Sequence, residues 1–148
     1  MSRCKLPDLA AMQGFGEAIA AKLEAGDVIA LSGGLGAGKT TLTRAILAAL
    51  GYPNEVPSPT FTILETYDAP PLRLPVVHAD FYRLENPSDI AELGLEEYCE
   101  GAVLIAEWPE KAGGFAHLPV CLSISLEIAG SGRAAIAQGG AAWQRRMP

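Results

Sequence analysis

Residues 33–41 of the sequence read GGLGAGKTT, and the first eight of them match the pattern G-x-x-x-x-G-K-[ST] in full. The four residues before this stretch, VIAL at 28–31, form an apolar run that is typical of a strand buried on both faces of a parallel sheet. After it, apolar residues recur at helical spacing as far as Leu50, and Gly51 is a residue type that commonly ends a helix. A strand, a glycine-rich loop and a helix in this order are the context in which the pattern binds phosphate. The sequence therefore predicts a phosphate-binding loop at this position.

The chemistry of the predicted loop follows from its residue types. Glycine lets the backbone approach phosphate oxygens closely, and N–H groups at the start of the following helix point toward the anion. Lys39 is placed to reach the β and γ phosphates, and the Thr40 hydroxyl is a ligand for Mg²⁺. The alternative, a glycine-rich turn with a solvated lysine, needs the flanking strand and helix to be there by chance. The other loop residues that we expect to contact a nucleotide are Gly33, Leu35, Gly36, Ala37, Gly38 and Thr41.

Length, charge and cysteine content limit the classes of protein to consider. A chain of 148 residues is expected to form a single domain over residues 1–148. Its net charge of −6 disfavours direct binding to nucleic acid, so any RNA partner is expected to be contacted through another protein. The 3 cysteines are widely spaced and indicate neither a disulfide framework nor a zinc site. No signal peptide or membrane span is recognisable, so we expect a cytoplasmic protein without a membrane partner.

Apolar runs and turn residues elsewhere in the chain predict the elements around the loop. We expect an α/β, P-loop NTPase-like, three-layer fold with a central mixed, mainly parallel sheet and a C-terminal antiparallel hairpin. The Gly- and Ala-rich end, residues 139–148, is expected to fray. The expected strands lie at 28–31, 61–67, 76–79, 103–106, 120–128 and 133–138, and the expected helices at 9–23, 42–50 and 88–93.

Two of the apolar runs end in an acidic residue. The run VVHA leads to Asp80, and the run VLIA leads to Glu107. If both strands lie parallel to the strand before the loop, their carboxyl ends meet the phosphate loop at the same edge of the sheet. Each acid is therefore a candidate metal ligand or water-positioning residue, and the alternative for each is an ordinary solvated acid at a strand end. His78, inside the first run, is expected to be a hydrogen-bonded core histidine rather than a ligand.

Four ordered blocks of the sequence stand out, namely GGLGAGKTTLTRAIL (33–47), SPTFTILETY (58–67), HADFYRL (78–84) and IAEWPEK (105–111). Together they resemble the TsaE family, the bacterial P-loop ATPase of tRNA threonylcarbamoyladenosine biosynthesis. The resemblance covers most of the chain, from about Pro7 to Ala137. It implies a P-loop fold, weak ATP hydrolysis in isolation and action with TsaB and TsaD proteins, which carry out the transfer to adenosine in tRNA.

The resemblance also implies roles for individual residues. Lys39 and Thr40 would hold the phosphates and the magnesium ion of ATP. Asp80 would be a Walker-B-like acid, and Glu107 would be a magnesium ligand or would position the attacking water. Thr60, in a segment that resembles a switch loop, is expected to approach the γ phosphate.

Further candidates come from the edges of these blocks. Trp108 follows the acid directly and is needed for function in the family, whereas the alternative is an aromatic residue that anchors the core. Arg133, in the predicted hairpin, is the candidate for an arginine that contacts the nucleotide in the family, and otherwise it is a solvated turn residue. Leu9 is also expected to contact the nucleotide. The chain has Met12 where the family often has threonine, a difference that bears on the adenine contact.

Other functions of phosphate-loop proteins need further motifs. A small GTPase would need N-K-x-D and D-x-x-G, and neither occurs in the sequence. A small-molecule kinase usually needs an arginine-bearing lid, but only Arg73 and Arg83 lie in the middle of the chain. A nucleotide-dependent regulatory binding module, which orders a loop on γ-phosphate contact and hardly turns over, is a third interpretation. It differs from the ATPase interpretation in whether hydrolysis or ATP occupancy matters.

Overall fold

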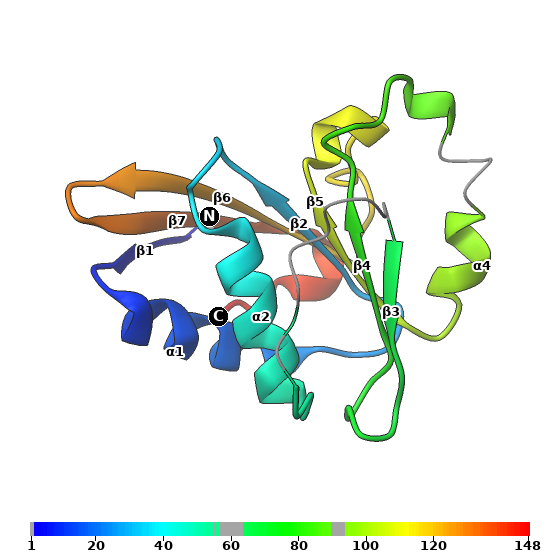
Figure 1. Cartoon of the computed structure of the whole chain (residues 1–148), viewed down its shortest axis with the longest axis horizontal. Helices are drawn as coiled ribbons and strands as arrows, with labels where there is room; N and C mark the ends of the chain where they lie inside the picture. Colours follow the sequence, from blue (N-terminus) through cyan, green and yellow to red (C-terminus); the bar gives the residue numbers. More distant parts are fainter. Residues whose placement is uncertain (1, 55, 57–63, 90–93) are drawn as a thin grey trace.

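A mixed sheet runs through the molecule in the strand order β1-β7-β6-β2-β5-β4-β3 (Figure 1). The computed structural model describes residues 2–54, 56, 64–89 and 94–148, and this strand order holds for that part of the chain. Strands β6, β2, β5 and β4 pair in parallel, whereas β3, β7 and β1 join the sheet through antiparallel pairs. The predicted mixed sheet with a C-terminal antiparallel hairpin, β6–β7, is confirmed. The strands are β1 (Ser2–Leu6), β2 (Val28–Ser32), β3 (Leu64–Tyr67), β4 (Val76–Asp80), β5 (Val103–Glu107), β6 (Cys121–Ala129) and β7 (Gly132–Gly139).

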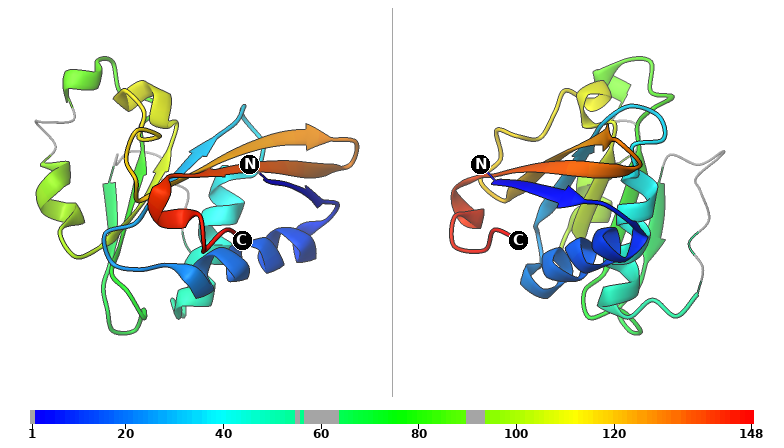
Figure 2. Two further views of the ribbon diagram at one scale, coloured as in Figure 1. Left: turned by 180° about the vertical axis from the view of Figure 1, so that it is seen from behind. Right: turned by 90° about the vertical axis from the view of Figure 1, so that its left-hand side faces the viewer.

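Helices cover both faces of the sheet, but unequally. Helices α1 (Leu9–Lys22) and α2 (Lys39–Leu50) pack against each other on one face, as Figures 1 and 2 show. Among the described residues, short elements pack over β4 and β5 on the other face, so the third layer is thin in that part of the chain. None of the helices built from the described residues has the length and apolar character that crossing a membrane requires. The short elements of the chain are the helix α4 (Leu95–Cys99) and the 3-10 turns η1 (Pro87–Asp89), η2 (Pro109–Ala112) and η3 (Ala141–Trp143).

Apolar side chains of the central strand β2 divide between two cores. Ile29 and Leu31 belong to the core under α1 and α2, whereas Val28 and Ala30 belong to the core on the opposite face. All four side chains are buried, and β2 has a parallel neighbour on each side, β5 and β6. The run VIAL lacks polar alternation because neither face of this strand meets water.

The structure differs from the sequence prediction at β1, at α4, which was not predicted, and in the segment predicted as a helix at 88–93. Strand β1 was not predicted, because four of its five residues are exposed and no apolar alternation marks it. It forms by pairing with β7, from Ser2 opposite Ala137 to Leu6 opposite Arg133. Of the helix predicted at 88–93, the described part is the 3-10 turn η1, and residues 90–93 lie outside the described residues.

The C-terminal segment, residues 139–148, packs against the molecule beside α1 (Figure 2). Trp143 is fully buried, and its indole N–H donates to the carbonyl oxygen of Val120 at 2.8 Å. The guanidinium of Arg146 donates to both carboxylate oxygens of Asp27, at 2.7 and 3.0 Å. The prediction that this end frays is wrong, because its few large side chains find partners that lie far away in the sequence.

A close approach of α1 to α2 holds α1 at the edge of the glycine-rich loop that precedes α2. At Gly16, a Cβ atom would lie 2.5 Å from the Cβ of Ala45 and 3.1 Å from the backbone of Ile46. Both neighbours belong to α2, so only a residue without a side chain fits between the two helices. The same helix carries Leu9 and Met12 toward the loop that precedes α2.

We expect Gly16→Ala to lower the free energy of unfolding by about 1–3 kcal/mol, because the added methyl group must push two packed helices apart. Gly14→Ala in the same helix is the matched control, since a Cβ at Gly14 meets nothing within 4 Å. That control should stabilise the protein by roughly 0.5–1 kcal/mol through helix propensity. Urea denaturation followed by circular dichroism measures both. Stabilisation by both substitutions would show that the helices are not in close contact.

We expect Arg146→Ala to lower the free energy of unfolding by roughly 2–4 kcal/mol, because it leaves the buried carboxylate of Asp27 without its ion partner. Arg145→Ala is the control, because Arg145 is exposed and its substitution removes the same charge. Its effect should stay within about 0.5 kcal/mol of the unchanged protein. Thermal and urea denaturation of the two variants measure the difference, and equal stabilities would mean that the C-terminal segment does not dock.

Candidate functional site

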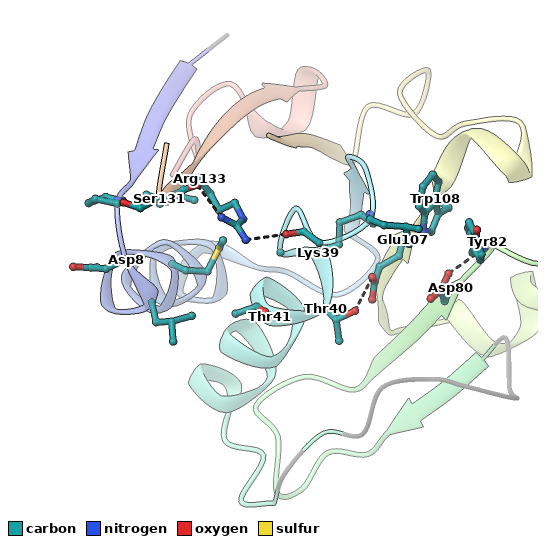
Figure 3. Close-up of a pocket in the computed structure, with 18 residues that line it drawn as sticks. Asp8, Lys39, Thr40, Thr41, Asp80, Tyr82, Glu107, Trp108, Ser131 and Arg133 are labelled. Carbon is teal, nitrogen blue, oxygen red and sulfur yellow. Dashed lines mark hydrogen bonds between the residues drawn. The ribbon is translucent and has the colours of Figure 1, made fainter. Parts of the chain in front are cut away.

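A cavity of about 650 Å³ opens where β2, β4 and β5 end and α2 begins (Figure 3). This volume lies within the usual range for sites that bind small molecules and cofactors. Asp8, Ser131 and Arg133 lie at one end of the cavity, and Tyr82 and Trp108 lie at the other. The predicted site residues that line it are Leu9, Leu35, Gly36, Gly38, Lys39, Thr40, Thr41, Asp80, Glu107, Trp108 and Arg133.

Two of the predicted site residues in the described part of the chain, Gly33 and Ala37, are not on the wall of this cavity. Gly33 and Ala37 lie behind the loop, where a Cβ on Gly33 would collide with the carbonyl oxygen of Leu126 and crowd the Ala37 side chain. Gly33 also has a φ of 142°, a conformation that side chains rarely adopt. These two residues therefore shape the loop from behind. Thr60 lies outside the described residues.

Lys39 is held by the loop that precedes it. Its ammonium group donates to the carbonyl oxygens of Gly33 at 2.6 Å and Gly34 at 2.9 Å. The ring of Trp108 covers the same ammonium group, with the centroid 4.3 Å away. Lys39 is only 6% exposed in this arrangement. To reach an anion in the cavity, the ammonium group must exchange the two carbonyl oxygens for oxygens of the ligand.

Trp108, whose ring covers Lys39, has an unusual backbone conformation. Its φ of 56° and ψ of 51° are left-handed, which is rare for a bulky residue and costs about 1–3 kcal/mol. Its N–H donates to the carbonyl oxygen of Leu31 at 3.3 Å, and its ring contacts the ring of Tyr82 with the centroids 4.9 Å apart. The side chain also packs against the core on the β4–β5 face. Trp108 therefore both anchors a core and forms part of the cavity.

The two acidic residues that end β4 and β5 lie side by side, because Asp80 is opposite Glu107 in the parallel pairing. Glu107 is 2% exposed, and its Oε1 accepts a hydrogen bond from the Thr40 hydroxyl at 3.0 Å. Its Oε2 lies 2.5 Å from Nε2 of His78, a buried histidine that is hydrogen-bonded as expected. Oδ1 of Asp80 accepts a hydrogen bond from the backbone N–H of Tyr82 at 3.0 Å. Glu107 is therefore not a solvated strand-end acid.

Burial shifts the pKa values of Lys39 and Asp80 in opposite directions. Burial lowers the pKa of Lys39, while the carboxylates of Glu107, Asp80 and Glu110 act in the opposite direction. Burial raises the pKa of Asp80, and the hydrogen bond from the N–H of Tyr82 opposes this change. An anion beside Lys39 and a cation beside Asp80 would each favour the charged form of its neighbour. A polyphosphate with a divalent cation meets both conditions.

Oxygen atoms in the cavity fit a magnesium ion that is shared with a ligand. Within the described part of the chain, no group of three or more His, Cys, Asp and Glu side chains could hold a metal ion alone. Mg²⁺ is usually bound by one or two carboxylates together with phosphate oxygens and water. The hydroxyl of Thr40 and the carboxylates of Asp80 and Glu107 supply such a partial set.

At the end of the cavity near Arg133, the sequence predicted some of the lining residues but not all of them. Arg133 is not simply solvated, because its Nη2 donates to the carbonyl oxygen of Gly36 in the glycine-rich loop at 2.9 Å. Met12 is 3% exposed and lines the cavity, and Leu9 is 75% exposed at its rim. Asp8 was not predicted to lie here. Its place just before an apolar-periodic segment was the available signal, because its side chain caps α1 by accepting from the N–H of Ala11.

Comparisons with known proteins agree with this architecture. A family profile described as "Threonylcarbamoyl adenosine biosynthesis protein TsaE" matches residues 6–135. The tRNA threonylcarbamoyladenosine biosynthesis protein TsaE of Synechocystis is 40% identical over 111 residues, which are 72% of this chain and 69% of that protein. The protein of the same name from Bacillus subtilis is 47% identical over 90 residues, which are 60% of this chain and 54% of that protein.

The fold comparison extends over nearly the whole chain. The crystal structure of Bacillus subtilis YdiB has a TM-score of 0.77 to this structure at 28% sequence identity. The match covers 97% of this chain and 89% of the YdiB chain.

The TsaE protein of Rickettsia bellii is 41% identical over 97 residues, which are 65% of this chain and 66% of that protein. The matched segments thus span about two thirds or less of the Rickettsia and Bacillus relatives' length.

The mixed sheet, with a glycine-rich loop between its central strand and α2, defines a P-loop NTPase-like α/β protein. Within that class, the chain belongs to the TsaE family.

Proposed function

We propose that this protein binds ATP with Mg²⁺ and hydrolyses it weakly by itself, acting with TsaB- and TsaD-type proteins in the threonylcarbamoylation of adenosine in tRNA. The observation that carries the nucleotide part is the cavity that brings Lys39, Thr40, Asp80 and Glu107 together at the start of α2. The names of the relatives, which refer to tRNA threonylcarbamoyladenosine biosynthesis, support the pathway. The net charge of −6 supports contact with tRNA through the partner proteins only.

Each part of the cavity has a task in holding a nucleotide. The first N–H groups of α2 have no partner within the helix, so they are available to phosphate oxygens. Lys39 exchanges the carbonyl oxygens of Gly33 and Gly34 for oxygens of the β and γ phosphates. Magnesium, when bound, neutralises charge on these phosphates, and Thr40 with Asp80 and Glu107 would hold it. Whether Glu107 binds the ion directly or orients water, its carboxylate must keep one orientation.

The hydrogen bonds of Glu107 support slow hydrolysis by the protein alone. Both of its oxygens already have partners within the protein, Thr40 and His78. A carboxylate engaged in this way has little capacity to accept a proton from attacking water. Lys39 is likewise engaged by carbonyl oxygens of the loop. We infer that partner proteins rearrange these contacts and so increase turnover.

Lys39→Ala should weaken ATP binding by roughly 10- to 100-fold, the effect of losing one charge-assisted hydrogen bond to phosphate. Lys111→Ala is the matched control. Lys111 is exposed and lies near the ring of Tyr82, and its substitution changes the net charge by the same amount. Its effect on affinity should be no more than about twofold. Isothermal titration calorimetry with and without Mg²⁺ measures both. Unchanged ATP affinity in Lys39→Ala would end the case for a phosphate-binding loop.

Addition of TsaB and TsaD should raise the rate of ATP hydrolysis roughly tenfold or more, which corresponds to about 1.4 kcal/mol of activation free energy. Phosphate release measured with and without the two proteins tests this, and Glu107→Ala should remove most of the increase. Equal turnover with and without partners would contradict the proposal. If the complex assembles only with ATP while turnover stays low in every mixture, the protein is instead a nucleotide-dependent binding module.

A further inference from the structure

We infer that His78 is a positioning residue that fixes the orientation of the Glu107 carboxylate, so that Oε1 of Glu107 stays on the hydroxyl of Thr40. The inference rests on the proposed function, because a fixed carboxylate matters for holding magnesium and nucleotide. It gives a task to a buried histidine on β4 that neither the phosphate-loop motif nor the cavity wall includes.

The three side chains form a row that crosses from α2 to the interior of the sheet. Thr40 lies in the first turn of α2, Glu107 at the end of β5, and His78 on the neighbouring strand β4. The hydroxyl of Thr40 meets one oxygen of Glu107 at 3.0 Å, and Nε2 of His78 meets the other at 2.5 Å. The side chains of His78 and Glu107 are 1% and 2% exposed. With a partner on each oxygen, the carboxylate cannot rotate without breaking a buried hydrogen bond.

The contact between His78 and Glu107 indicates which ring nitrogen acts as the donor. An ionised carboxylate can only accept, so Nε2 must donate to Oε2 of Glu107. Nδ1 is buried and has no hydrogen-bond partner among the described residues. Within the described part of the chain, a proton on Nδ1 would be a buried donor without an acceptor, which is more costly than an unused lone pair. The tautomer with its proton on Nε2 is the one that satisfies both constraints.

Packing alone does not account for a histidine at this position. In the sheet, His78 lies between the buried, apolar Ile105 on β5 and Glu65 on β3, and the flanking Val77 and Ala79 belong to the core on the other face. An apolar residue in its place would not leave a buried nitrogen without a partner. What the histidine adds is a donor for Oε2 of Glu107. Without that donor, Oε2 would be buried and unsatisfied, and rotation of the carboxylate toward the cavity would take Oε1 away from Thr40.

The test compares His78→Leu with His78→Gln in the full chain. Leucine removes the donor, whereas the side-chain amide of glutamine can place an N–H near the position of Nε2. We expect His78→Leu to raise the Mg²⁺ concentration for half-maximal ATP binding roughly tenfold or more, with little change in ATP affinity when Mg²⁺ is absent. His78→Gln should recover most of the loss. Titration calorimetry over a series of Mg²⁺ concentrations measures this.

Ile105→Val is the control for packing, because Ile105 is buried beside His78 and does not touch the carboxylate through a polar group. It should lower the melting temperature without changing the Mg²⁺ dependence. A purely structural role for His78 predicts that leucine and glutamine shift ATP binding equally with and without Mg²⁺, and that result would overturn the inference. If the unchanged protein itself shows no Mg²⁺-dependent ATP binding, the proposed function fails, and the inference fails with it.

A measurement on the unchanged protein keeps the test decisive if His78→Leu does not fold. Nitrogen-15 NMR of the imidazole rings identifies the protonated nitrogen of each histidine. We expect a protonated Nε2 and an unprotonated Nδ1 for His78, with coupling of the Nε2 proton across the hydrogen bond to Glu107. A His78 ring protonated on Nδ1 alone could not donate to Glu107, and this result would overturn the inference.

Discussion

Parallel pairing of β2 with β5 is the constraint on which the site depends, because it places Glu107 beside Leu31, the residue before the end of β2. The glycine-rich loop follows β2 just beyond this point, and α2 begins with Thr40 within hydrogen-bond distance of Glu107. A shift of one residue in this register would turn the Glu107 side chain to the other face of the sheet. The pairing of β5 with β4 adds Asp80 in the same way. The chemistry of the cavity is thus a product of strand register.

In this cavity, the charged groups of Lys39 and Glu107 already have interaction partners within the protein. The ammonium group lies between two loop carbonyl oxygens and an indole ring, and Glu107 lies between a hydroxyl and an imidazole. Each arrangement satisfies a buried charge, which would otherwise be costly to keep out of water. A ligand must therefore replace existing interactions, so net affinity depends on the difference between the two sets of contacts. The left-handed backbone at Trp108 is part of what maintains the present set.

Much of the fold and of the site could be predicted because the relevant signals are local in the sequence. The glycine pattern around Lys39, the apolar run before it, and the acids at the ends of two other runs all required only neighbouring residues. Strand β1 could not be predicted, since its residues become a strand only by pairing with β7. The docked end was missed because Arg146 finds Asp27 across most of the chain. The partner of His78 was missed for the same reason, since hydrogen-bond partners across strands leave no periodic trace.

The chain has 2 tryptophans, and the structure places them in contrasting surroundings. Trp143 is enclosed in the core with the guanidinium of Arg146 over its ring, whereas Trp108 is partly exposed with the ammonium group of Lys39 over its ring. Indole emission responds to nearby charge and to water, so the two rings report on different events. Light emitted by Trp108 follows whatever moves Lys39, and that of Trp143 follows docking of the C-terminal segment. The protein thus carries two intrinsic optical probes, one for its cavity and one for its folding.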